Sequence, residues 1–386
     1  MNLDFLFPLE EPFLEEISEY PETSLSRFVG IHTKEQGIPD LENVSIAILG
    51  VQDGRGAVNN DTTGYGVDAI RKYFYKLYPG NWSQKIVDLG NIPQGASVQD
   101  TYFALREVIT SLVKKNIVPI ILGGGQDITY VNYRAYDSLE QLVNIVSVDS
   151  KFDLGALESP LNSNSFLSKI VMEEPANLFN YSNIGYQTFF NSQDEIDLLD
   201  SLSFDAYRLG EAKDLKIVEP IMRDADIVSI DIGAVRMGEA PGNGNATPNG
   251  FYGDEICAIS RYAGISDKVT SFGVYEFNNR LDVQGQTAHL IAQMVWYFIE
   301  GHSFRSNDYP YCTKEKYIKY IVPHEDENMV FYKSHKSGRW WLEIHSMNDN
   351  KYKRHALIPC TQDDYMDATS QKVPERWYKA LKKINL

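Results

Sequence analysis

The sequence predicts an α/β fold in which a mostly parallel sheet is covered by helices on both faces. Short apolar runs such as Val44–Val51, Ile117–Leu122 and Ile227–Ile232 are typical of strands buried on both sides. Between such runs lie segments with apolar residues at helical spacing, for example Val67–Leu77 and Tyr102–Lys115. Strands that alternate with helices in this way build parallel sheets.

Length, charge and cysteine content limit the classes of protein that fit. The 386 residues allow one large α/β domain and an appendage. A net charge of −17 argues against nucleic-acid binding, because too few Lys and Arg remain to neutralise phosphates. The three cysteines are widely spaced, so no disulfide framework is indicated. We find no signal peptide and no apolar run of the roughly 18 residues that span a membrane. We expect a cytoplasmic protein without membrane insertion.

The composition changes near Ser303. Residues 1–302 carry the alternating pattern, with residues 1–40 as an acidic, proline-punctuated lead-in. Residues 303–386 are rich in Tyr, Lys and Trp, and the alternation of strands and helices stops there. We therefore predict one main α/β domain followed by a small C-terminal extension.

Within the extension, Val330–Tyr332 and Trp340–Ile344 predict a β-hairpin, and Pro374–Ile384 predicts a terminal helix. The aromatic residues are of the kind that anchor protein interfaces, which favours a role in binding or assembly.

The residues best suited to chemistry follow the predicted strand Leu142–Val148. Asp149, Lys151 and Asp153 alternate along the chain, so in an extended segment they would point to the same side. They would lie at the carboxyl end of a parallel strand, which is where ligands bind in open α/β sheets.

Other predicted strands end in comparable loops, Gly123-Gly-Gly-Gln-Asp127 and Ser229-Ile-Asp-Ile-Gly233, and Glu276 ends the last predicted strand of the main sheet, Val269–Glu276. Together with Asp149-Ser-Lys-Phe-Asp153, these motifs resemble, in the same order, those of the ureohydrolases, the family of arginase, agmatinase and formimidoylglutamase. The resemblance runs from about Ile46 to Gly301. It implies an arginase-like three-layer α/β/α sandwich that assembles as a homo-oligomer, a trimer or hexamer.

The motifs depart from those of active family members, in which two histidines and four aspartates hold two manganese ions. By the resemblance, the two histidines are replaced by Gln126 and Lys151, and the last aspartate by Gly233, whereas three aspartates remain: Asp149, Asp153 and Asp231. Protonated lysine has no free electron pair and glycine has no side chain, so the second metal position loses the two ligands that bind only that ion. Hydrolysis that requires both ions is therefore expected to be lost.

Two alternatives remain for this degenerate metal centre. In the first, one divalent cation, Mn²⁺ or Mg²⁺, is bound by Gln126 and the three aspartates. In the second, which the loss of both imidazoles favours, no cofactor binds. Lys151 then replaces the cation and holds Asp149 and Asp231 by charge-assisted hydrogen bonds.

Candidate substrate-binding residues also follow from the resemblance. Glu276 matches the glutamate that contacts a guanidinium or formimidoyl group, although it could equally be one more carboxylate of the polar cluster. Asn162, Ser163 and Asn164 match the loop that grips the amino-acid end of the substrate, or they form a plain surface turn.

We interpret the chain as a catalytically silent or strongly altered ureohydrolase-fold protein that acts through binding or assembly, with itself or with an unknown protein partner. The alternative is a metal-dependent amidine hydrolase with a reduced, single-metal site, or an altered chemistry in which Lys151 acts as base or nucleophile beside Glu276. Formimidoylglutamate is the first substrate to test.

Overall fold

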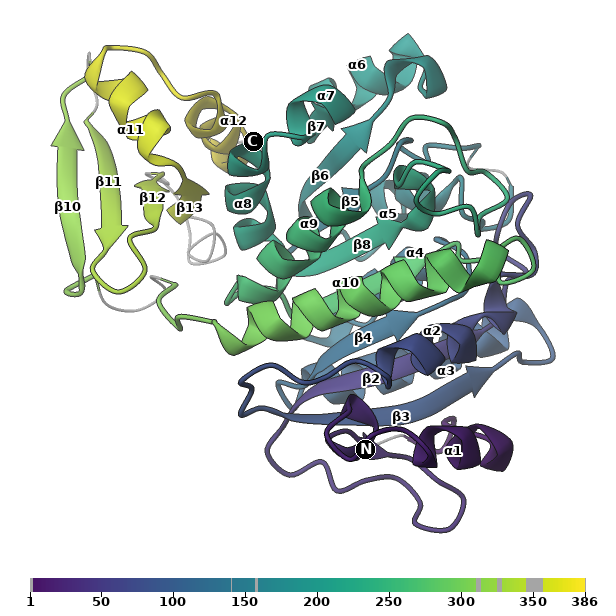
Figure 1. The fold of residues 1–386 in the computed structure, drawn as a ribbon. Coiled ribbons are helices and arrows are strands. Elements are labelled where there is room, and N and C mark those ends of the chain that lie inside the picture. The colour runs from purple at the N-terminus through teal and green to yellow at the C-terminus, as the bar shows by residue number, and fades with distance from the viewer. Residues whose placement is uncertain are drawn as a thin grey trace.

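The computed structural model describes residues 3–139, 141–156, 159–309, 314–324, 328–344 and 357–385. Its main body is a nine-stranded parallel sheet in the order β1-β3-β2-β4-β9-β8-β5-β6-β7 (Figure 1). The strands are β1 (Gly30–Ile31), β2 (Val44–Gln52), β3 (Lys85–Pro93), β4 (Val118–Leu122), β5 (Val143–Val148), β6 (Leu178–Tyr186), β7 (Asp205–Arg208), β8 (Ile227–Asp231) and β9 (Ser271–Tyr275).

Helices cover both faces of this sheet. One face packs against α1 (Glu11–Ser18), α2 (Val67–Phe74), α8 (Leu215–Asp224), α9 (Gly253–Ile265) and α10 (Gln286–Ser303). The opposite face packs against α3 (Val98–Val113), α4 (Ile128–Arg134), α5 (Phe166–Met172) and α6 (Gln193–Ser201). The short α7 (Leu209–Ala212) follows β7. The predicted three-layer α/β/α sandwich is confirmed.

Strand β2 shows why the strands of this sandwich are apolar at nearly every position of their sequence. Ile46 and Ile48 pack into one layer, whereas Ala47, Leu49 and Val51 pack into the other, because successive side chains of a strand point to opposite faces. The sequence analysis missed the edge strand β7, which spans Asp205–Arg208. Its residues are only partly buried, so it has no apolar run to mark it.

A four-stranded antiparallel sheet in the order β10-β11-β12-β13 forms the end of the chain, with two helices packed on it (Figure 1). Its elements are β10 (Tyr317–Val322), β11 (Met329–Ser334), β12 (Trp340–Glu343), β13 (Leu357–Cys360), α11 (Gln362–Thr369) and α12 (Glu375–Asn385). Strands β11 and β12 pair where the sequence predicts a hairpin. The division of the chain at residue 302 stays a prediction.

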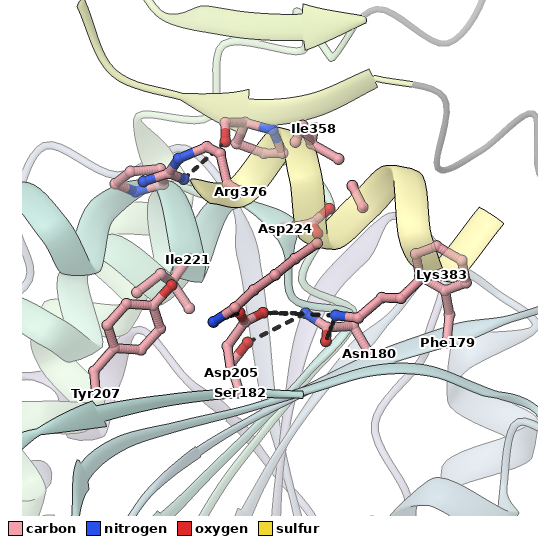
Figure 2. A pocket seen from close by; sticks show the side chains of 14 residues that line it. Phe179, Asn180, Ser182, Asp205, Tyr207, Ile221, Asp224, Ile358, Arg376 and Lys383 are labelled. Atoms are coloured by element: carbon pink, nitrogen blue, oxygen red, sulfur yellow. Dashed lines mark hydrogen bonds and ion pairs between the residues drawn. The ribbon is translucent and has the colours of Figure 1, made fainter. Parts of the chain in front are cut away.

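Two groups of charged side chains attach this sheet to the main body. The buried guanidinium of Arg223, on α8, donates to the carbonyl oxygens of Trp340 and Cys360, both at 2.9 Å, and lies 5.0 Å from the ring centre of Trp341. Figure 2 shows the second group, where Lys383 of α12 points towards Asp205 at the start of β7, with an N–O distance of 3.7 Å. The cavity drawn there lies at the amino ends of β6 and β7, on the opposite edge of the sheet from the loops described below.

None of the helices in the described residues has the length and apolarity needed to cross a bilayer.

We predict that Arg223→Met lowers the free energy of unfolding by about 2–5 kcal/mol, because it removes the donors of two buried carbonyl oxygens. Urea unfolding followed by circular dichroism measures this change. Lys372→Met is the control, since its ion pair with Asp367 is exposed and should contribute less than about 1 kcal/mol. Equal midpoints for the two variants would show that Arg223 does not hold the second sheet in place.

Candidate functional site

Four neighbouring strands, in the order β4-β9-β8-β5, bring the predicted motif loops together at one edge of the sheet. All four strands are parallel, so the residues that follow them lie side by side: Gln126 after β4, Glu276 after β9, Asp231 at the end of β8, and Asp149 after β5. A cavity of about 150 Å³ opens there. Its lining includes four carboxylates, Asp149, Asp153, Asp231 and Glu276, and one cationic side chain, Lys151. We call it the acidic cavity.

Asp149 and Asp153 form a buried pair of acids. Asp149 is 2% exposed; its Oδ1 accepts the backbone N–H of Lys151 at 2.9 Å, and its Oδ2 is buried without an N–H or hydroxyl donor. The neighbouring Asp153 carboxyl can donate a hydrogen bond to Asp149 only when it carries a proton. Asp153 has a left-handed backbone with φ of 55°. Burial, and next the charge of Asp149, raises the pKa of the Asp153 carboxyl well above its usual range. The pair therefore favours sharing a proton or binding a cation.

Asp231 adds a third buried carboxylate. Its Oδ1 accepts the backbone N–H of Gly233 at 2.6 Å and the side-chain amide of Asn243 at 3.4 Å. Burial, followed by the charges of Asp149 and Glu276, raises the pKa of Asp231 well above its usual range. The acidic cavity is thus short of positive charge.

Glu276 is fixed in place by hydrogen bonds to both of its carboxylate oxygens. Oε1 accepts the backbone N–H of Gln126 at 2.9 Å, and Oε2 accepts the side-chain amide of Asn60 at 2.8 Å. Burial raises the pKa of Glu276 to about 7. Because the side chain also lines the acidic cavity, it presents a held carboxyl group to a ligand.

Gln126 is fully buried and is not among the residues that line the cavity. Its Nε2 donates to the hydroxyls of Ser147 at 3.2 Å and Ser229 at 3.4 Å, whereas its Oε1 has no hydrogen-bond donor. Two buried oxygens without donors, Gln126 Oε1 and Asp149 Oδ2, therefore belong to two of the four predicted metal ligands. Unpaired buried acceptors are costly, and amide and carboxylate oxygens are ligands that Mg²⁺, Ca²⁺ and Mn²⁺ accept.

The amide and carboxylate oxygens of these residues suit one hard cation, but the side chains lie too far apart to coordinate it together. Within the described ranges, no three His, Cys, Asp or Glu side chains are grouped closely enough to hold an ion. A cation bound here would have to draw the three aspartates together.

Lys151 does not form the hydrogen bonds that the sequence predicts for it, although its charge partly offsets the rise that burial causes in the pKa values of Asp149, Asp153 and Asp231. Its side chain lines the cavity, yet its ammonium forms no hydrogen bond or ion pair with any described residue, so the expected charge-assisted bonds to Asp149 and Asp231 are not formed. The reason is local: strand β5 ends at Val148, and the Lys151 backbone N–H bonds to the Asp149 carboxylate in a turn. The segment is therefore not extended as assumed.

The candidate substrate loop contributes two of its three residues to the cavity. Ser163 and Asn164 line the cavity, and Ser163 is tied to the loop after β2 through a bond from its N–H to the Gly56 carbonyl oxygen at 2.8 Å. Asn162 does not line it. Its side chain accepts the N–H of Asn164 at 3.0 Å, which closes a turn within the loop itself.

The sequence analysis missed Asn60, which joins three loops around the site. Its amide donates to the carbonyl oxygen and Oε2 of Glu276, both at 2.8 Å, and its Oδ1 accepts from the Gly244 N–H at 3.0 Å and from Asn278 at 2.9 Å. Phe190, Asn245 and Thr247 also line the cavity from loops that carry no motif. Neither Asn60 nor Asn245 has a sequence signal, because the side-chain amide of each bonds to a loop far away in the chain.

The fold and the acidic cavity define a protein of the ureohydrolase type. The Arginase family model matches residues 44–300, and the chain therefore belongs to the arginase family. Among similar proteins, the formimidoylglutamase of Streptococcus gordonii is 25% identical over 291 residues, covering 70% of this chain and 88% of that protein. The formimidoylglutamase of Corynebacterium efficiens is 26% identical over 310 residues, covering 74% and 96%.

Solved structures share the fold. The formiminoglutamase of Trypanosoma cruzi with Mn²⁺ superposes with a TM-score of 0.64 at 19% identity, covering 73% of this chain and 98% of that one. The agmatine ureohydrolase of Thermoplasma volcanium gives a TM-score of 0.60 at 19% identity, covering 75% and 97%.

We predict that Lys151→Met changes the free energy of unfolding by less than about 1 kcal/mol, because the ammonium forms no hydrogen bond or ion pair and only its weaker attraction to Asp149, Asp153 and Asp231 is lost. Lys268→Met is the matched comparison. Its ammonium is fully buried and lies 2.8 Å from Asp224 and 3.7 Å from Asp226, so its removal should cost about 3–5 kcal/mol. Thermal melts of both variants at neutral pH measure the difference. A loss at Lys151 as large as that at Lys268 would restore the replacement-cation hypothesis.

Proposed function

We propose that the chain is a hydrolase of linear amidines that works with one divalent cation. The observation that carries this proposal is a pair of buried oxygens, Gln126 Oε1 and Asp149 Oδ2, that have no N–H or hydroxyl donor and belong to a cluster with Asp153 and Asp231. Membership of the arginase family, and the similarity to formimidoylglutamases over most of their length, support a hydrolase. This favours the alternative from the sequence analysis over the silent protein.

Gln126, Asp149, Asp153 and Asp231 would hold the cation, which when bound would act as a Lewis acid towards the amidine or water. Glu276, held by Asn60 and by the Gln126 N–H, would pair with the cationic amidine. Ser163 and Asn164 would contact the remainder of the substrate from the opposite loop. Water would add to the amidine carbon and lose a proton to a cavity carboxylate. Lys151, the cationic side chain of the cavity, would donate a proton to the leaving amine as the carbon–nitrogen bond breaks.

A second candidate function is binding without hydrolysis. It is favoured by the positions of Lys151 and Gly233, which give a second ion no ligand, and by the open spacing of the three aspartates. In that case the acidic cavity would bind a cationic ligand, and the chain would work through a partner. A homo-oligomer and a cytoplasmic location stay predictions for either function.

We expect the protein, purified with added manganese, to retain one ion per chain and to hydrolyse formimidoylglutamate, with arginine and agmatine as comparison substrates. Metal analysis and a product assay measure the two properties. Asp149→Asn and Asp231→Asn should abolish both, whereas Asp194→Asn, on an exposed turn of α6, should change neither. Folded protein with neither metal nor turnover would favour the silent binding protein, and two ions per chain would contradict a single-cation site.

The triple change Gln126→His, Lys151→His and Gly233→Asp should raise the manganese content from one ion to two and increase turnover towards the common range of about 1–10³ s⁻¹. The Gly233 step requires movement, because a Cβ at this position would lie 3.0 Å from Asp231 Oδ1. Gln126→His with Lys151→His alone is therefore the control, and it should remain at one ion. A triple variant that folds but binds no second ion would show that the scaffold has changed beyond the ligands.

A further inference from the structure

A second cavity, of about 300 Å³, opens at the same edge of the sheet beyond the ends of β6, β7 and β8. Three cationic side chains line it, Arg208, Lys213 and Arg236, and its lining residues include no aspartate or glutamate. We call it the basic cleft. A local excess of positive charge is unexpected in a chain whose net charge is −17.

Arg236 has a fixed backbone and an unpartnered side chain. Its N–H donates to the Phe251 carbonyl oxygen at 3.1 Å, which holds the loop after β8 against the loop before α9. Its Nε is buried and has no hydrogen-bond partner, and no described residue forms an ion pair with its guanidinium. The guanidinium carbon lies 4.6 Å from the ring centre of Tyr252. A buried donor of this kind is costly unless a ligand accepts from it.

Lys213 is placed over the same aromatic ring. Its ammonium lies 4.7 Å from the ring centre of Tyr252, so one ring contacts two cations. The carboxylate nearest to Lys213 is that of Glu255 at 3.9 Å, and this oxygen already accepts the Tyr252 N–H at 2.8 Å. The ring orients the two cations, but it does not neutralise their mutual repulsion.

Arg208 completes the cleft from the end of β7. Its Nε donates to the Tyr186 hydroxyl at 3.1 Å, and the rest of the side chain is exposed. The neutral part of the lining is joined by a hydrogen bond from the Gln187 side chain to the Asn249 carbonyl oxygen at 3.2 Å.

We propose that the basic cleft binds a small anion with a carboxylate or phosphate group, which accepts from Arg236 and pairs with Lys213 and Arg208. The planar guanidinium fork matches both groups, and either one would offset the repulsion between the cations. This site does not depend on hydrolysis in the acidic cavity. The two cavities share walls, since Thr247 and Phe190 line the acidic one whereas Pro248 and Thr188 line the basic one.

Isothermal titration calorimetry at low ionic strength tests the site. L-glutamate and inorganic phosphate are the separate probes, and sodium chloride of equal ionic strength is the reference. Wild-type protein should bind at least one probe at a single saturable site. Arg236→Gln should weaken that binding by about tenfold or more, because it removes a charged donor. Lys216→Gln, on the exposed surface of α8 outside the cleft, should leave it unchanged.

Binding of glutamate alone would identify a carboxylate ligand, and binding of phosphate alone a phosphate ligand; both outcomes uphold the site. Binding of neither probe, or equal affinity in wild type and Arg236→Gln, would overturn it. If Arg236→Gln does not fold, Lys213→Gln provides the same comparison, because its side chain is partly exposed and its ammonium makes one long ion pair, with Glu255 at 3.9 Å, and a cation–π contact with Tyr252.

Discussion

The burial of several carboxylates at one edge of the sheet is the constraint on which the site depends. A buried carboxylate must gain a cation, a proton or several hydrogen-bond donors to offset the loss of water. Asp149 and Asp231 each accept a backbone N–H group, and Asp153 lies against Asp149. Their raised pKa values express that deficit. The loops around these aspartates leave them in need of a positive charge, and no cationic side chain of the described residues forms an ion pair with them.

Asp88 shows what this chain does with a buried carboxylate that is purely structural. Its two oxygens accept from the Arg71 guanidinium at 2.8 and 2.9 Å, and the Tyr75 hydroxyl donates at 2.7 Å. Lys268 pairs with Asp224 in a similar way. These two fully buried cations contact carboxylates directly, whereas Lys151, which is only partly buried, lines the acidic cavity without a hydrogen bond or ion pair to a described residue. This contrast within one molecule favours a site that receives its cation from outside.

The carboxyl edge of the sheet carries two cavities of opposite charge. The acidic one lies over β4, β9, β8 and β5, and the basic one lies over β8, β6 and β7. Strand β8 serves both, because Asp231 ends it and Arg236 follows five residues later. The same parallel topology that gathers carboxylates at its centre thus places cations beside them. The edge is dipolar, as a zwitterionic ligand would require.

The sequence by itself determined the parallel α/β fold and the location of Asp149, Asp231 and Glu276 at strand ends, since apolar periodicity and motif order are local properties of the chain. Tertiary structure decided the rest. The direction of Lys151 depends on a turn closed by the Asp149 carboxylate, and Asn60 acts through loops more than 180 residues away. The basic cleft joins Arg208 and Lys213, at the two ends of α7, to Arg236 from the loop after β8. Such contacts form only when the strands adopt their spatial order, which periodicity along the chain does not encode.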